Sequence, residues 1–127
     1  MVTTILVVDD EPDMRRLVCA VIEIANDGLE VVAEATDGAE AMTIWRGLNG
    51  PPQPDVVILD NRMPHASGME VAREIFQERP DQLVVLHSAY LDDETRAEAT
   101  SVGIAACVPK ADVFTLPDVI RELSPRR

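Results

Sequence analysis

Five apolar segments alternate along the chain with acidic or turn-forming residues, and they predict the strands of one sheet. Segments 4–8, 56–59 and 83–86 are continuous and rich in β-branched side chains, as in strands that a parallel sheet buries on both faces. Segments 30–35 and 105–109 contain glutamates, or small residues followed by a proline, which is typical of edge strands.

Between these segments apolar residues recur at spacings of three and four, which predicts five amphipathic helices. We expect the first helix to begin near Pro12, the third at Ser67 or Gly68, and the fourth at residues 92–94. The fourth helix has the weakest pattern and ends at Gly103. The side chains expected to face the core are Met14, Leu17, Val18, Val21, Ile22, Ala25, Ala41, Met42, Trp45, Leu48, Met69, Ala72, Ile75, Phe76, Ala97, Val102, Leu116, Val119, Ile120 and Leu123.

This alternation predicts an α/β fold in which five helices flank a five-stranded, doubly wound parallel sheet. We expect residues 1–127 to form a single domain, because the length and the apolar content suit one core. The C-terminal ends of parallel strands lie along one edge of the sheet, where such folds bind ligands. The polar residues that the pattern brings to this edge are Asp9, Asp10, Asp60, Ser88 and Lys110.

Composition and charge disfavour several classes of function. The net charge of −12 disfavours a nucleic-acid surface and fits a cation or a basic partner better. The apolar run before Asp9 is far too short for a signal segment or a membrane span, so we expect a cytoplasmic protein. Cys19 and Cys107 are expected to be buried free thiols, and the spacing of His65 and His87 offers no zinc or catalytic set.

The residues expected at the sheet edge suit phosphoryl transfer. Three carboxylates so close together would repel one another unless a cation joined them, and ligands that are all oxygen favour Mg²⁺. The hydroxyl of Ser88 and the ammonium group of Lys110, the only lysine of the chain, complete what a phosphoryl group needs. Asp60 is then the expected nucleophile, forming an aspartyl phosphate.

Four short motifs occur in order along the chain. They are residues 7–11 (VVDDE), 59–64 (LDNRMP) with Gly68 and Glu70 following, 86–89 (LHSA), and Gly103 with Lys110. Each motif is weak alone, whereas the ordered set is highly specific. With this set, the chain resembles over essentially its whole length the receiver domain of two-component response regulators. The resemblance implies a flavodoxin-like sheet with strand order 2-1-3-4-5.

The resemblance implies a role for each polar residue of the edge. Asp60 would accept a phosphoryl group from a sensor histidine kinase or a phosphotransfer protein. Ser88 would form a hydrogen bond with a phosphoryl oxygen, and Lys110 would pair with the same group. The implied ligands of a bound Mg²⁺ are Asp9, Asp10, Asp60 and the backbone carbonyl of Arg62.

By the same resemblance the chain is a signalling switch and not a conventional enzyme, since it would catalyse only its own phosphorylation and dephosphorylation. Residues 110–123 look most like receivers of LuxR/NarL-type regulators, so the expected output is transcription. That output would act through protein partners or through a DNA-binding domain that this chain does not contain. We expect no direct binding to nucleic acid or membrane, while a homodimer is compatible with the resemblance.

Two features depart from the family pattern or modify it. The switch aromatic that usually lies three residues before the lysine is Cys107 here, so we expect Tyr90 to share the gating with Ser88. Arg62 and Tyr90 flank the acceptor, and their bulk is expected to slow autodephosphorylation by shielding the approach of water.

Two other functions stay open. A pseudo-receiver that is not phosphorylated and serves as a docking or dimerisation module is compatible with Cys107. A Mg²⁺-dependent phosphohydrolase with an aspartyl-phosphate intermediate would need a second acid two residues after the nucleophile, where Arg62 stands. The sequence contains neither of the common glycine-rich nucleotide-binding loops, which disfavours a nucleotide enzyme.

Overall fold

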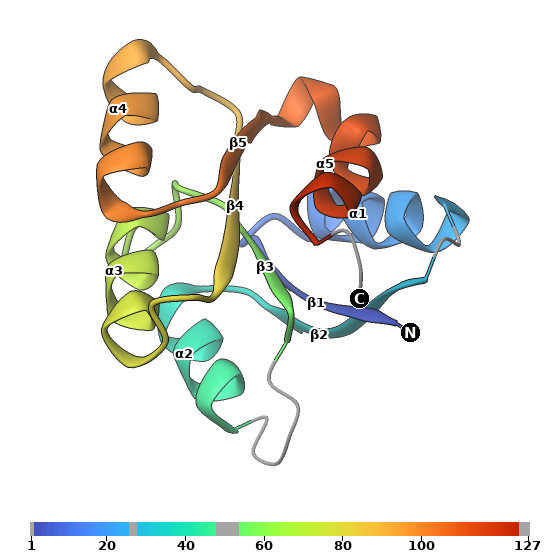
Figure 1. The fold of residues 1–127 in the computed structure, drawn as a ribbon, viewed down its shortest axis with the longest axis horizontal. Helices are drawn as coiled ribbons and strands as arrows, with labels where there is room; N and C mark the ends of the chain where they lie inside the picture. Colours follow the sequence, from blue (N-terminus) through green and yellow to red (C-terminus); the bar gives the residue numbers. More distant parts are fainter. Residues whose placement is uncertain (1, 26–27, 48–53, 125–127) are drawn as a thin grey trace.

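Five parallel strands form one sheet in the order β2-β1-β3-β4-β5, as expected (Figure 1). The computed structural model describes residues 2–25, 28–47 and 54–124. The strands are β1 (Thr3–Val8), β2 (Leu29–Ala35), β3 (Val56–Leu59), β4 (Leu83–Ser88) and β5 (Ala106–Pro109). The two segments with edge-strand character are the two outer strands of the sheet, which confirms that prediction.

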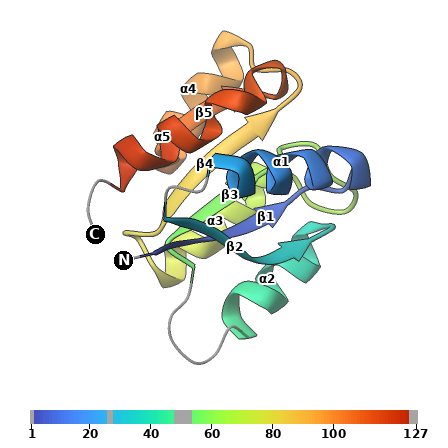
Figure 2. The ribbon, with the colours of Figure 1, turned by 90° about the vertical axis from the view of Figure 1, so that its right-hand side faces the viewer.

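Helices cover both faces of the sheet. One face carries α1 (Pro12–Ala25) and α5 (Leu116–Leu123), and the other carries α2 (Gly38–Gly47), α3 (Gly68–Glu78) and α4 (Asp93–Val102) (Figures 1 and 2). A short 3₁₀ helix, η1 (Lys110–Thr115), joins β5 to α5 and was not expected from the sequence. No helix within the described ranges is both long and apolar enough to cross a membrane.

The three central strands separate two cores. Leu6, Leu59 and Leu86 point toward α2, α3 and α4, whereas their neighbours Val7 and Val85 point toward α1 and α5. This alternation is the period of an extended strand, in which successive side chains face opposite sides of the sheet. The same alternation therefore determines which face of the sheet each polar side chain points to where it follows one of these strands at the C-terminal edge.

Two core predictions need correction. Leu17 is 37% exposed, because α1 buries the narrower stripe that contains Val18 and Ile22. In α4 the buried residue is Ala99, whereas Ala97 is exposed. Thr95, Ala99 and Val102 share the inward face at a spacing of four and three, and the small or polar side chains of Thr95 and Ala99 gave that face no hydrophobic signal.

Ala25 is only partly buried and is not part of either core, whereas the other expected core positions are buried or pack against the cores where the structure describes them. Leu48 lies outside the described residues. Gly103 ends α4 in the left-handed conformation, with a φ of 112°, as a helix-ending glycine does.

Buried hydrogen bonds hold the N-terminal edge of the sheet together. The indole of Trp45, in α2, donates a hydrogen bond of 2.9 Å to Oε1 of Gln82. The amide nitrogen of Gln82 donates in turn to the carbonyls of Pro54 and Asp55, at 3.1 and 3.0 Å. These bonds connect α2 to the beginnings of β3 and β4, so Trp45 has a packing role.

Candidate functional site

The sheet itself places the first two carboxylates. The backbone N–H of Asp9 donates to the carbonyl of Ala35 at 3.1 Å, and that of Asp60 donates to the carbonyl of Val8 at 3.0 Å. The ladder thus continues one residue beyond β1 and β3 and fixes both acids at the C-terminal edge. Asp9 and Asp60 are only 2% and 3% exposed.

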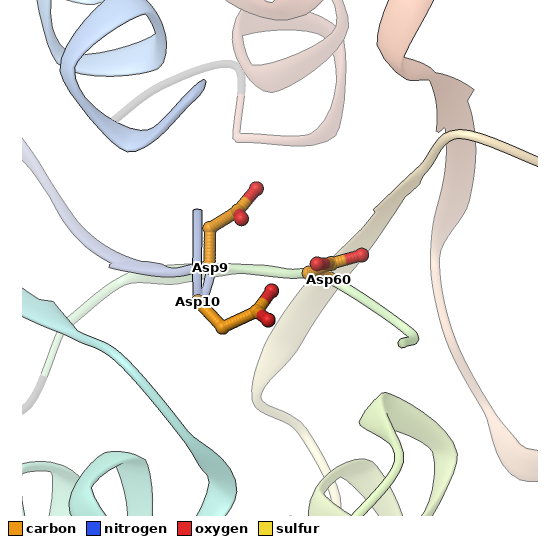
Figure 3. Close-up of side chains that lie close together, drawn as sticks. All are labelled: Asp9, Asp10 and Asp60. Carbon is orange, nitrogen blue, oxygen red and sulfur yellow. The ribbon is translucent and has the colours of Figure 1, made fainter. Parts of the chain in front are cut away.

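Asp10 joins these two carboxylates from the loop after β1 (Figure 3). Asp9, Asp10 and Asp60 each offer one carboxylate oxygen, and these oxygens all lie within 4.8 Å of one another. Such a set of hard oxygen ligands, with one exposed member, fits a small divalent cation that keeps part of its water shell, as Mg²⁺ does. Within the described residues no other group of three acids, histidines or cysteines has this geometry.

Lys110 brings a positive charge into the same cluster. Its Nζ lies 3.1 Å from Oδ2 of Asp9 and 3.3 Å from Oδ2 of Asp60. Glu11 lies at the edge of ion-pair distance, 4.0 Å from the same nitrogen, and its place in the site was not expected from the sequence. The ammonium group therefore lies between the two buried carboxylates and offsets part of their repulsion.

The electrostatic environment of Asp60 disfavours its charged form. Burial, followed by the charge of Asp9, raises the pKa of Asp60 to about 6, although Lys110 and the backbone N–H of Arg62 act in the opposite direction. Burial lowers the pKa of Lys110, but the charges of Asp60 and Asp9 outweigh it, so the pKa is raised. In the absence of a cation the ammonium group alone does not compensate the buried acids.

The loop after Asp60 is held by the beginning of α3. The N–H of Gly68 donates to the carbonyl of Asn61 at 2.9 Å, and the N–H of Met69 donates to Oδ1 of Asn61 at 3.2 Å. Ser67 and Glu70 form a capping box at the start of the helix. A Cβ at Gly68 would lie 2.4 Å from the carbonyl oxygen of Asp60, which explains why a glycine is needed there.

Ser88 lies on the wall of a hollow of about 350 Å³ at the same edge. The residues that line it are Asp10, Glu11, Pro12, Asp60, Arg62, Ser88, Ala89 and Lys110. The Oγ of Ser88 lies 3.4 Å from both the backbone nitrogen and the carbonyl oxygen of Tyr90, so these long contacts occupy it only weakly. The hollow is thus bounded by acids, an ammonium group and a hydroxyl, a set that suits an oxyanion accompanied by a cation.

Arg62 and Tyr90 stand beside this hollow. The guanidinium carbon of Arg62 lies 5.8 Å from the centre of the Tyr90 ring, which is a cation–π contact. Tyr90 is 59% exposed and does not line the hollow itself. Cys107 lies farther away, half-buried against the core under α2, α3 and α4 and opposite Leu86 in the sheet.

Most of the expected site residues therefore come together. Asp9, Asp10, Asp60 and Lys110 are in one cluster, and Ser88 and Arg62 line the hollow beside it. Glu11, together with Asn61 in the supporting loop, completes the surroundings and was missed. Both follow a motif acid directly in sequence, and that adjacency was the available signal.

Comparisons with known proteins identify the family. A model of the response regulator receiver domain matches residues 5–121. A curated relative from Anaeromyxobacter dehalogenans, named protein-glutamate methylesterase/protein-glutamine glutaminase 3, is 35% identical over 107 residues, which are 84% of this chain and 30% of that protein. The chain spans about a third of the length of the curated relatives it matches.

Two solved structures are similar over almost the whole chain. A LuxR-family two-component response regulator from Aurantimonas sp. has a TM-score of 0.87 and 28% identity, covering 97% of this chain and 85% of that one. The response regulator TrrA from Thermotoga maritima, solved in complex with Mg(2+)-BeF, has a TM-score of 0.77 and 34% identity, covering 96% and 99%. The LuxR/NarL subfamily is not confirmed, because the curated relatives are methylesterases. The chain belongs to the response regulator receiver domains, the phosphorylation-dependent switches of two-component systems.

Proposed function

We propose that this domain is switched by transfer of a phosphoryl group to Asp60 from a histidine kinase or a phosphotransfer protein. The observation that carries this proposal is the position of Asp60, whose buried carboxylate lies beside Asp9, Asp10 and Lys110 and also lines the hollow. A buried acid with a raised pKa in such a hollow is a typical reactive group.

In the proposed reaction an Oδ atom of Asp60 attacks the phosphorus of the donor. The bond from phosphorus to the donor histidine breaks, its electron pair goes to the imidazole nitrogen, and Asp60 becomes an acyl phosphate. A bound Mg²⁺ would supply positive charge to the phosphoryl oxygens. Its proposed ligands are Asp9, Asp10, Asp60 and the backbone carbonyl of Arg62.

Lys110 and Ser88 would hold the product. The ammonium group of Lys110 already lies 3.3 Å from Asp60, so a small displacement would pair it with a phosphoryl oxygen. The hydroxyl of Ser88 makes only long contacts with Tyr90 and is free to turn toward the same group. That turn would move the loop after β4, and we propose it as the first step of the switch, shared with Tyr90 in the absence of an aromatic residue at position 107.

The proposal is tested with acetyl phosphate as the phosphoryl donor and Mg²⁺ as the cation. We expect the intact mass of the protein to increase by one phosphoryl group, and we expect no increase in Asp60→Asn. Asp81→Asn, which removes an exposed carboxylate at the opposite edge of the sheet, is the matched control and should be modified like the wild type. Modification of Asp60→Asn at the wild-type rate would refute the assignment.

Two further measurements, phosphate release from a phosphomonoester and Mg²⁺ binding, separate the two alternatives. Steady release of phosphate from a phosphoester would indicate a phosphohydrolase, although Arg62 stands where that class needs its second acid. Absence of both modification and Mg²⁺ binding would leave a docking module. The complete set of acids, hydroxyl and lysine around one hollow favours the switch over both.

For the output we propose control of transcription, supported by the likeness of the fold to a LuxR-family regulator. The curated relatives favour a different output, the methylesterase and glutaminase activity in their names. The gene that encodes residues 1–127 discriminates between them: a helix-turn-helix segment in the same reading frame supports transcription, and a methylesterase domain contradicts it. Sedimentation with and without acetyl phosphate tests whether phosphorylation produces the proposed homodimer.

A further inference from the structure

The side chain of Lys110 must cross the end of β4. Lys110 follows β5, yet its Nζ lies 3.3 Å from Asp60, at the end of β3, and 3.1 Å from Asp9, at the end of β1. In the strand order β2-β1-β3-β4-β5, β4 separates β5 from β3. The methylene chain of Lys110 therefore spans the width of one strand before its ammonium group reaches the carboxylates.

His87 lies in the path of this side chain. It is paired with Val108 in β5, and on the other side the register of Leu59 with Leu86 places it next to Asp60. His87 comes two residues after Val85, which points toward α1 and α5. By the alternation of an extended strand, the imidazole points toward that same face.

The burial of His87 has no explanation in ordinary core packing. The residue is 1% exposed, and its Nε2 has no hydrogen-bond partner among the described residues. Its neighbours on this face of the central strands are aliphatic, as Val7, Val85 and Val108 show. A buried polar atom without a partner destabilises a fold, so an aliphatic residue would suit this position better if it served packing alone.

The positive charge of Lys110 affects the pKa of the His87 imidazole. Burial, and after it the positive charge of Lys110, lowers the pKa of His87 to about 4, while Asp9 acts in the opposite direction. The ring is therefore neutral at physiological pH, and it can lie against a cationic side chain without repelling it.

We infer that His87 is a positioning residue for Lys110, forming the surface against which the lysine methylenes lie as the ammonium group reaches Asp60 and Asp9. This inference rests on the proposed phosphorylation of Asp60. Lysine side chains bury their aliphatic part along such surfaces and leave the charged end at its polar partners. Without the ring, the ammonium group would be free to turn toward Glu11 or toward water, and it would less often be placed for the phosphoryl group.

The chain offers a direct test because Lys110 is its only lysine. Lysine labelled with ¹³C gives one set of side-chain NMR signals. We expect nuclear Overhauser effects between the His87 ring protons and the Lys110 methylenes. In His87→Ala the Lys110 signals should sharpen, and the rate of phosphorylation by acetyl phosphate should fall about 10-fold because the ammonium group is less often in place. His87→Phe, which restores a flat ring, should recover both properties.

Controls separate positioning from stability. Val85→Ala removes buried side-chain volume from the same strand and face, and it should lower the stability while the Lys110 signals stay unchanged. If His87→Ala does not fold, His87→Val takes its place, with the same loss expected. Absence of the Overhauser effects, or wild-type Lys110 signals and rates in the variants, would overturn the inference. Failure of the wild type to be phosphorylated would refute the proposed function, while the Lys110 signals would still decide whether His87 positions that side chain.

Discussion

Oδ2 of Asp60 lies 3.3 Å from Nζ of Lys110, yet the pKa of Asp60 is raised to about 6. A contact of this kind usually stabilises the carboxylate form. Here Lys110 is shared with Asp9, which lies closer at 3.1 Å, and burial opposes both charges. The site is therefore poorly compensated until a cation arrives.

Replacing Asp60 by Asn should stabilise the protein at neutral pH without Mg²⁺. The pKa of Asp60 rises from 3.8 to about 6 on folding, so the folded state binds more protons between these values and stability is lost as the pH rises through them. Asn removes this loss, and we expect a gain of roughly 1–3 kcal/mol above about pH 6 that disappears below about pH 4. Urea denaturation at both ends of this range measures the gain, and a variant less stable than the wild type at neutral pH would contradict the prediction.

Asp10→Asn should weaken Mg²⁺ binding by about 10-fold or more while leaving the stability of the metal-free protein nearly unchanged, because Asp10 is exposed. Isothermal titration calorimetry measures the affinity. Asp93→Asn, an exposed acid of α4, is the control and should bind like the wild type. In the wild type the affinity should fall as the pH drops below about 6, since protons compete for Asp60. Equal affinity in Asp10→Asn and the control would exclude Asp10 as a ligand.

Gly68→Ala should destabilise the protein by about 1–3 kcal/mol, because the new Cβ would lie 2.4 Å from the carbonyl oxygen of Asp60 and must displace backbone. The same displacement should slow phosphorylation by acetyl phosphate. Gly47→Ala is the matched substitution, since no heavy atom lies within 4 Å of its added Cβ, and it should be neutral or slightly stabilising. Thermal unfolding of both variants decides the matter, and similar effects at the two glycines would count against the close contact.

Arg62→Ala and Tyr90→Ala should each shorten the lifetime of the phosphorylated form. The two side chains hold each other beside the hollow, so loss of either should also mobilise the other. An exposed cation–π contact of about 0.5–1 kcal/mol corresponds to a coupling of roughly 2- to 5-fold. The rate of phosphate loss in both single variants and the double variant gives this coupling. Strictly multiplicative effects, or unchanged lifetimes, would exclude a shared shield.

Tyr90→Ala should in addition weaken the response that follows phosphorylation, while Asp60 is still modified. The reason is that Ser88 Oγ contacts the backbone of Tyr90, so movement of the hydroxyl and of the ring are linked. The phosphorylation-dependent change in the NMR spectrum of α4 and β5 reports this response. A full response in Tyr90→Ala would remove Tyr90 from the switch.

The sheet and the polar residues along its C-terminal edge were predictable because their signals are local. Continuous β-branched runs predict buried strands. The acid or lysine that follows a strand, as at Asp60 and Lys110, then lies at the C-terminal edge that all the strands share. The inward face of α4 was not predictable, because Ala99 is too small to stand out in a hydrophobic pattern. The place of Glu11 beside Lys110 depends on a contact between residues almost a hundred positions apart, which periodicity does not encode.

Helix α4 contributes one fully buried side chain, Ala99, among its described residues, whereas the opposite edge of the sheet is tied by the hydrogen bonds of Trp45 and Gln82. The least tightly packed part of the fold therefore lies next to Ser88, and the most firmly bonded part lies at the N-terminal edge of the sheet. We therefore expect a change at Asp60, such as the proposed phosphorylation, to displace α4 before the more tightly packed elements. With only Ala99 fully buried and Val102 partly buried against the core, α4 is the helix beside the site with the least packing, and amide exchange should be fastest along it.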